Sequence, residues 1–237
     1  PLGVNPDVIR NIILATVAAC IIIVTAARFI PKPRHSSIGP RANLEKLELT
    51  SDEHRNPQEK DLSGTVVQYI LSDEQINKTY ENAMQYFQDK RDNACLVEIN
   101  RLLNSNASFS IKQKSNVLKS YLAEPTFDSL VDNYTYTQVA NDPLLYLDAW
   151  VVWSGRVSNA EELANGSWRC DLLVGYENMK TVEGIVPLTF DPAPVPSIDG
   201  ERALQVLAQI TLDSGRISLK GKSVYQPLMG KELPKRQ

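Results

Sequence analysis

The chain has 237 residues, of which 43% are apolar and 22% are charged, and its formal net charge is −3. This composition excludes a disordered, a collagen-like or a disulfide-rich chain, and the length is sufficient for one or two domains with a hydrophobic core. The mean hydropathy of −0.25 conceals an uneven distribution, because much of the apolar content lies in one block near the N-terminus.

This apolar block, residues 12–30, contains a single charged side chain, that of Arg28. In a helix, a segment of this length covers about 28 Å, which matches the hydrocarbon layer of a bilayer. A core helix is rarely apolar on every face over such a length. We therefore predict that residues 1–30 form a short tail and a single membrane span. Its main apolar residues are Ile12, Leu14, Val17, Ile21, Ile22, Ile23, Val24, Phe29 and Ile30.

A cleaved signal peptide is the alternative interpretation of this block. Arg10 precedes it, and the run ending at Cys20 (Val-Ala-Ala-Cys) is similar to a bacterial lipobox, whose cysteine is lipidated. However, only residues 12–16 form an apolar region before this run, and the most apolar part, residues 21–24, follows Cys20. We therefore favour the span and interpret Cys20 as a thiol that faces lipid or packs against protein.

The orientation of the span depends on its flanking charges. Arg10 stands alone before the block, whereas Arg28, Lys32, Arg34 and Arg41 follow. By the positive-inside rule this count places the remainder of the chain in the cytoplasm. Because a tail of about ten residues has little weight in that rule, both orientations stay open at this point.

Residues 31–70 are predicted to form a flexible tether. Residues 31–63 are rich in proline, serine and charge and have no sustained apolar period. Both histidines of the chain, His35 and His54, lie in this segment. The domains predicted after it therefore contain no imidazole for acid–base catalysis, a nucleophilic triad or zinc.

Residues 71–135 are predicted to form a small antiparallel three-helix domain. Ser72 and Gln75 match a capping box, and apolar stripes at helical spacing begin at Ile76, Leu96 and Ile111. Residues 72–125 resemble a tetratricopeptide-like helical hairpin followed by a capping helix. The chain has no second copy at a period near 34, so a repeat array is not expected.

Residues 140–228 are predicted to form a five-stranded β-barrel, because the apolar period changes toward two and turn residues separate the runs. Gly155 lies in the first run, where a barrel strand must bend sharply. The expected strands are residues 149–157, 168–176, 182–190, 204–212 and 216–225. Residues 229–237 follow as a tail, and the fold class of the whole chain is α+β.

The first strand, Val152–Val157, and the last hairpin, Ile210–Val224, resemble those of an OB-fold, in particular the bacterial OB modules related to the tRNA-anticodon-binding type. This resemblance implies a small closed barrel. A helix between the third and fourth strands, which such folds often have, is not expected, because Pro192, Pro194 and Pro196 occupy that interval.

The sequence predicts no catalytic residue, no metal site and no cofactor. Cys95 and Cys170 have no CxxC partner and are interpreted as buried structural thiols. The run from Gly221 to Ser223 imitates the end of a phosphate-binding loop, but Arg216 occupies the position of the first required glycine. We therefore expect a protein that is not an enzyme.

An OB-like barrel invites the hypothesis of nucleic-acid binding through aromatic stacking and basic side chains. Residues 136–237, however, contain 10 basic and 12 acidic residues, a net charge of −2, whereas a phosphate-binding groove has a basic excess. Nucleic acid is therefore not the expected partner. The candidate interaction surface comprises Trp150, Trp168, Arg169, Tyr176, Lys220 and Lys222.

Residues 173–177 and 183–185 are similar to segments of spirochaete envelope proteins. Proteins that surround the flagellar motor are one class of these envelope proteins. This similarity favours the periplasm over the count of basic residues. We expect a non-enzymatic, single-pass scaffold of a cell-envelope assembly, with other envelope proteins, the bilayer and further copies of the chain as partners. The alternative is an OB-fold module on the cytoplasmic membrane face that binds nucleic acid or a ligand. A lipid or haem chaperone is disfavoured, because the barrel has no histidine to attach its ligand.

Overall fold

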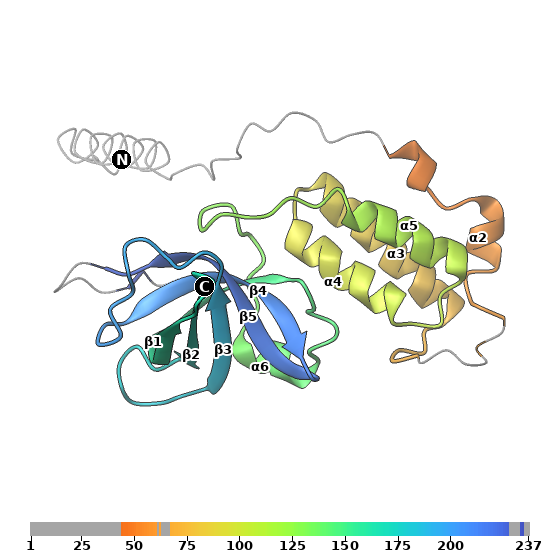
Figure 1. Cartoon of the computed structure of the whole chain (residues 1–237). Helices are drawn as coiled ribbons and strands as arrows, with labels where there is room; N and C mark the ends of the chain where they lie inside the picture. Colours follow the sequence, from red (N-terminus) through yellow and green to blue (C-terminus); the bar gives the residue numbers. More distant parts are fainter. Residues whose placement is uncertain (1–43, 61, 63–66, 228–232, 235–237) are drawn as a thin grey trace, which may run out of the picture. The chain divides into compact units, whose positions relative to one another are not determined.

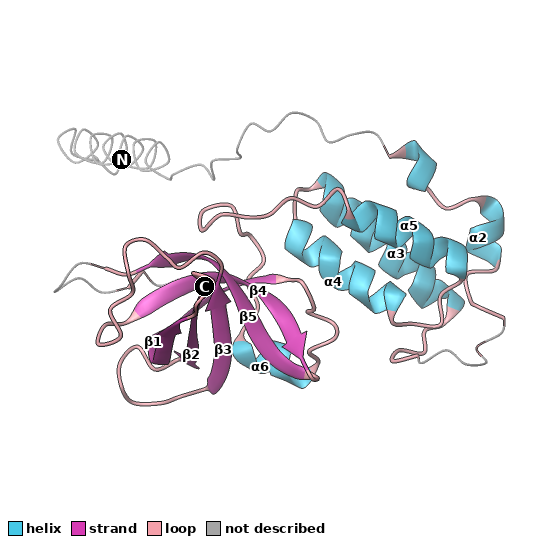
Figure 2. Ribbon diagram, in the orientation of Figure 1, coloured by secondary structure: helices cyan, strands magenta, loops and turns pink. Residues whose placement is uncertain are grey.

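The computed structural model describes residues 44–60, 62, 67–227, 233 and 234 (Figure 1). The predicted membrane span lies outside these residues. Within the part of the chain that is described, no helix combines the length and the apolar character needed to cross a membrane. The described residues contain a group of helices and a β-barrel, so the α+β class is confirmed (Figure 2).

The three predicted helices are present as α3 (Asp73–Gln88), α4 (Asp92–Leu103) and α5 (Phe109–Lys119). The capping box at the start of α3 is formed, because the Ser72 hydroxyl accepts from the Gln75 N–H and the Gln75 side chain accepts from the Ser72 N–H. Helix α4 packs against both α3 and α5 and is buried over most of its length. It is therefore the central helix of the group.

Residues 44–60 differ from the flexible tether that the sequence predicts over 31–70. They form η1 (Glu45–Leu47) and α2 (Ser51–Arg55), and Leu44 and Leu47 are each only 7% exposed. These two leucines pack in one cluster with residues of α3, α4 and α5. Isolated leucines in a charged segment show no period, so their burial depends on the helices they contact rather than on the local sequence.

The five predicted strands form a closed barrel with the neighbour order β1-β2-β3-β5-β4 (Figure 2). The β3–β5 pair is parallel, and all other pairs are antiparallel. This closure places one set of alternating side chains inside the barrel. The strands are β1 (Trp150–Glu162), β2 (Trp168–Val174), β3 (Gly184–Phe190), β4 (Leu204–Asp213) and β5 (Arg216–Tyr225).

Gly155 is the point at which β1 passes from one neighbour to the other. It pairs with Leu204 of β4 and also with Val174 of β2. A Cβ atom at this position would overlap the carbonyl oxygen of Leu173. The close approach of the β2 backbone therefore requires glycine at position 155, where the sequence predicts a bend.

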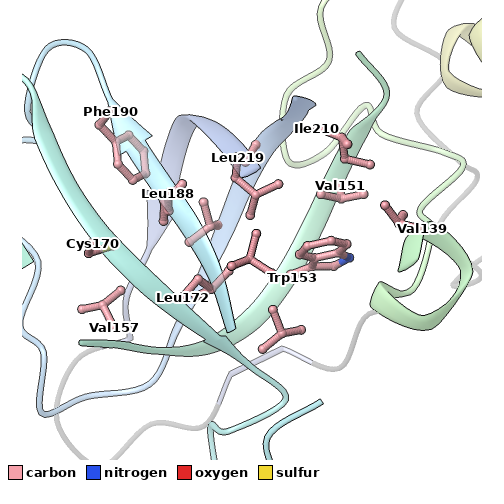
Figure 3. Packing of buried hydrophobic residues seen from close by; sticks show 14 of the residues in the cluster. Val139, Val151, Trp153, Val157, Cys170, Leu172, Leu188, Phe190, Ile210 and Leu219 are labelled. Carbon is pink, nitrogen blue, oxygen red and sulfur yellow. The ribbon is translucent and has the colours of Figure 1, made fainter. Parts of the chain in front are cut away.

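A helix that precedes β1 closes one end of the barrel. Residues 191–203, all of which are described, contain no helix, as the prolines predict. Instead, Val139 of α6 (Tyr136–Asn141) is fully buried in the barrel core (Figure 3). The Tyr136 ring stands edge-on to Trp153, with ring centroids 5.6 Å apart. The sequence did not predict α6, because six residues show too little of a helical period.

Candidate interaction surfaces

Two asparagine side chains cover the open edge of β1, where Trp150 and Val152 have no neighbouring strand on the side opposite β4. The Asn93 Oδ1 accepts from the Trp150 N–H at 2.7 Å, and its Nδ2 donates to the Trp150 carbonyl at 2.8 Å. Asn133 binds Val152 in the same way, at 2.8 and 3.1 Å. The two amides thus take the place of a strand and satisfy four backbone groups.

Further contacts join the helices to the segments around the barrel. The Asn100 Nδ2 donates to the carbonyls of Leu145 and Leu147, at 3.0 and 2.7 Å. Ion pairs link Arg91 to Asp132 at 2.6 Å and Lys119 to Asp148 at 2.7 Å. Since Asn93 and Asn100 are both buried on α4, this helix and the barrel are held in one arrangement.

The structure brings together three of the six predicted surface residues, Trp150, Lys220 and Lys222. The Lys222 Nζ lies 5.1 Å from the centre of the Trp150 ring and 2.7 Å from a carboxylate oxygen of Glu124. Lys220 is exposed on the same strand, and Gln209 of β4 lies between it and Trp150 in the register. These basic side chains and the indole therefore share one side of the barrel, at strands β1, β4 and β5.

The other predicted residues do not join this group. The Trp168 ring packs on Phe190, with ring centroids 6.0 Å apart, and belongs to the margin of the barrel core. Arg169 is exposed but forms an ion pair with Glu161 of the paired strand. Tyr176 follows β2 and is half-buried. The six residues thus do not form one continuous site.

The β2–β3 hairpin exposes apolar residues that the sequence did not indicate as a site. Met179 and Val182, in the connection between the strands, are 62% and 40% exposed, and Ile185 of β3 is 63% exposed. Ile185 pairs with Leu173 of β2, which is half-buried. We call these four residues the hairpin surface. Strand alternation already indicates that Ile185 points outward, because Val186 and Leu188 point inward.

Two charged side chains next to Leu173 of the hairpin surface, those of Asp171 and Arg156, have partners within the chain. Asp171 accepts from the Asn159 Nδ2 at 2.7 Å, and an Arg156 Nη atom donates to the Glu201 carbonyl. The indole of Trp153 points into the barrel and is only 4% exposed (Figure 3). Trp153 therefore offers no stacking surface for a base on the outside of the barrel. Arg156 and Arg169 each already bind a group of this chain.

The described residues contain no group of three or more His, Cys, Asp and Glu side chains placed to hold a metal ion. Cys95 and Cys170 are both buried, in agreement with their interpretation as structural thiols. Burial, with a smaller contribution from nearby Asp171, raises the pKa of Cys170 to about 12. A thiol with this pKa is protonated at neutral pH and is a weak nucleophile.

The closed five-stranded barrel with this strand order fits an OB-fold. Residues 128–225 match the family model described as Spirochaete C-terminal OB fold, so this part of the chain is linked to spirochaetes. Residues 56–119 match a model described as Domain of unknown function (DUF8514). The tRNA-anticodon-like and tetratricopeptide-like resemblances receive no support from these matches. A search of curated proteins finds no match to the chain.

Proposed function

We propose that this protein is a non-enzymatic scaffold of a spirochaete cell-envelope assembly. The helices and the OB-fold barrel together form a rigid support for protein–protein contacts. The proposal gives none of their residues a catalytic role. The apolar block at residues 12–30 anchors the chain in the membrane as a single span. Periplasmic structures around the flagellar motor are the kind of assembly proposed.

The observation that carries this proposal is the hairpin surface on a barrel that is fixed to the helices. Ile185 is exposed on a strand whose other outward neighbours, Pro187 and Thr189, carry no charge. An apolar surface on a rigid support suits burial against another protein, because little conformational entropy is lost on binding. Asp171 and Arg156, beside Leu173, already have partners within the chain, and this favours a protein over a polyanion.

Site-specific photo-crosslinking in cells tests the proposed surface. We expect a photoreactive residue at position 185 to give a discrete adduct with another envelope protein, and the same residue at exposed Glu74 of α3 to give none. Ile185→Asp in the otherwise native chain is expected to abolish co-purification of that protein while the thermal unfolding of the variant stays unchanged. Equal adducts at positions 185 and 74 would contradict the proposal.

Protease treatment of intact spheroplasts tests the location. We expect the helices and the barrel to be digested, because the proposal places them outside the cytoplasmic membrane. Protection of these domains in intact spheroplasts, followed by digestion after lysis, would contradict the periplasmic location and favour the cytoplasmic side.

The alternative function is an OB-fold module that binds nucleic acid or another ligand on the cytoplasmic membrane face. Its support is the sequence resemblance of residues 152–157 and 210–224 to tRNA-anticodon-binding modules, together with the basic side of the barrel at Lys220 and Lys222, next to Trp150. The pairing of Lys222 with Glu124 and the net charge of −2 over residues 136–237 weigh against it.

A further inference from the structure

The connection between β2 and β3 presents a methionine to solvent. Met179 is 62% exposed and has a positive φ of 58°. Its N–H donates to the Tyr176 carbonyl at 3.1 Å, and the N–H of the next residue, Lys180, donates to the Asn178 Oδ1 at 3.0 Å. These hydrogen bonds hold the turn, and its left-handed conformation at position 179 favours glycine or asparagine over methionine. Neither the turn nor a hydrophobic core therefore accounts for a thioether at this position.

Met84 of α3 lies in a different environment. It is half-buried and packs against two clusters of core residues, one that contains Phe87 and one that contains Tyr80. Met84 and Met179 are the methionines in the part of the chain that the structure describes. Because an oxidant must reach the sulfur atom, oxidation of a thioether depends on its exposure. The structure thus predicts that Met179 reacts before Met84.

We propose that Met179 is a site of reversible oxidation by hydroperoxides and that this oxidation weakens binding at the hairpin surface. The Met179 sulfur attacks one oxygen of hydrogen peroxide, and the O–O bond breaks. The sulfur loses the two electrons that the peroxide gains, and the products are methionine sulfoxide and water. Methionine sulfoxide reductases reverse the reaction with electrons from thiols.

Oxidation changes the chemistry of the hairpin surface at one of its four residues. A thioether is apolar and polarizable, and it adapts to the shape of a protein partner. The sulfoxide oxygen is a strong acceptor, and its burial against apolar groups without a hydrogen bond is unfavourable. Met179 lies in the same connection as Val182, which is 40% exposed, so the sulfoxide would be covered with it when a partner binds. This inference rests on the proposed function, because it concerns regulation of the same surface.

The fold itself is expected to tolerate the modification. Met179 belongs to none of the three core clusters of the described residues, whereas Met84 packs against two of them. The additional oxygen at position 179 can point into water in the unbound chain. Oxidation of Met179 therefore separates loss of binding from loss of stability, which oxidation in a core does not.

Peptide mass spectrometry of the full chain in phosphatidylcholine vesicles tests the modification site. After addition of hydrogen peroxide, we expect Met179 to be oxidised at least fivefold faster than Met84. In the chain unfolded by urea the two rates are expected to be equal, which controls for the local sequence. Methionine sulfoxide reductases A and B are expected to restore Met179. Equal rates in the folded chain, or a sulfoxide that neither reductase reduces, would overturn the proposal.

Co-purification tests the effect on binding. The chain is oxidised alone, and catalase removes the peroxide before solubilised envelope proteins are added. We expect oxidation to lower recovery of the protein that is crosslinked at position 185 at least fivefold. For Met179→Leu, which cannot form a sulfoxide, the loss relative to its own untreated sample is expected to be less than twofold. Met84→Leu is the matched control and should be as sensitive as the native chain.

The thermal unfolding of the native chain is expected to be the same before and after this treatment. An equal loss of recovery in Met179→Leu, or full recovery with oxidised native chain, would overturn the proposed regulation. Failure of the proposed function gives a different result, namely no adduct at position 185 in the untreated chain. The ratio of the oxidation rates at Met179 and Met84 does not depend on that partner and tests the modification site by itself.

Discussion

The amide of Asn93 forms with Trp150 both hydrogen bonds that a neighbouring strand would form, at 2.7 and 2.8 Å. The same Nδ2 also donates to the Asp132 carbonyl at 2.5 Å. A single side chain of α4 therefore closes the edge of β1 and holds the segment that leads into the barrel. Alanine at this position would leave a backbone N–H and two carbonyls without these partners.

Asn93→Ala is accordingly expected to lower the free energy of unfolding by about 2–4 kcal/mol, because unsatisfied backbone groups in a partly buried place are costly. Urea denaturation followed by circular dichroism measures this change. The control is Asn116→Ala on exposed α5, for which we expect a change within about 0.5 kcal/mol. A similarly small change for Asn93→Ala would show that water replaces the amide.

Gly155→Ala tests the close approach at the bend of β1. The added methyl group would overlap the Leu173 carbonyl, and a backbone atom cannot move aside as a flexible side chain can. We expect a loss of about 3 kcal/mol or more, measured by thermal unfolding and soluble yield. Gly200→Ala is the control, since the nearest atom to a Cβ there is 3.8 Å away. Similar stability of the two variants would contradict the need for glycine at 155.

Glu53 makes the packing of residues 44–60 sensitive to acid. Burial tends to raise the pKa of its carboxyl, but the Lys114 ammonium and the N–H and hydroxyl groups of Thr50 outweigh this and lower it to about 2. A carboxyl whose folded-state pKa is depressed contributes stability above its unfolded-state pKa. That stability is lost as the pH falls from about 5 toward 2.

Glu53→Gln should therefore reduce the free energy of unfolding at pH 7 by about 1 kcal/mol, since the N-cap interaction of α2 and the ion pair are weakened. The difference from the native chain is expected to shrink as the pH approaches 2. Urea denaturation at several pH values measures it. Glu162→Gln, at the exposed end of β1, is the control. A difference that stays constant down to pH 2 would exclude the proposed role of the carboxylate.

Filter binding of single-stranded oligonucleotides at low salt distinguishes the two proposed functions. For the scaffold we expect no retention that depends on Lys220 and Lys222. Retention that falls steeply with salt and is reduced at least tenfold in the Lys220→Ala, Lys222→Ala double variant would support the nucleic-acid module instead.

The elements of this protein were predictable from the sequence where the signal is local. The apolar stripes of α3, α4 and α5 and the alternation along the five strands each repeat several times within one segment. The Ser72 capping box and Gly155 are also local signals, because a cap and a bend need particular residues at particular positions. For α6 the segment was too short, and for residues 44–60 the leucines were too few, for a period to show.

The candidate surfaces were harder to predict, because composition does not say which aromatic side chains face outward. Trp150 and Trp153 lie on the same strand. The Trp150 ring lies under Lys222, whereas the Trp153 ring is enclosed with Tyr136 at the end of the barrel. The sequence singled out Trp168, which packs on Phe190, and omitted Ile185, which is exposed. Strand alternation alone gives two sets of residues and does not decide which set is inside until the barrel closes.

The sequence by itself determined the periodic elements, the balance of charge and the absence of histidine after His54, since these depend only on the order of residues. The tertiary structure decided that Asn93 and Asn133 act as a substitute strand for β1, that α6 closes the barrel, and that Ile185 is left exposed. Each of these depends on groups far apart in the chain, and the burial or pairing of one group is fixed only when the other is in place.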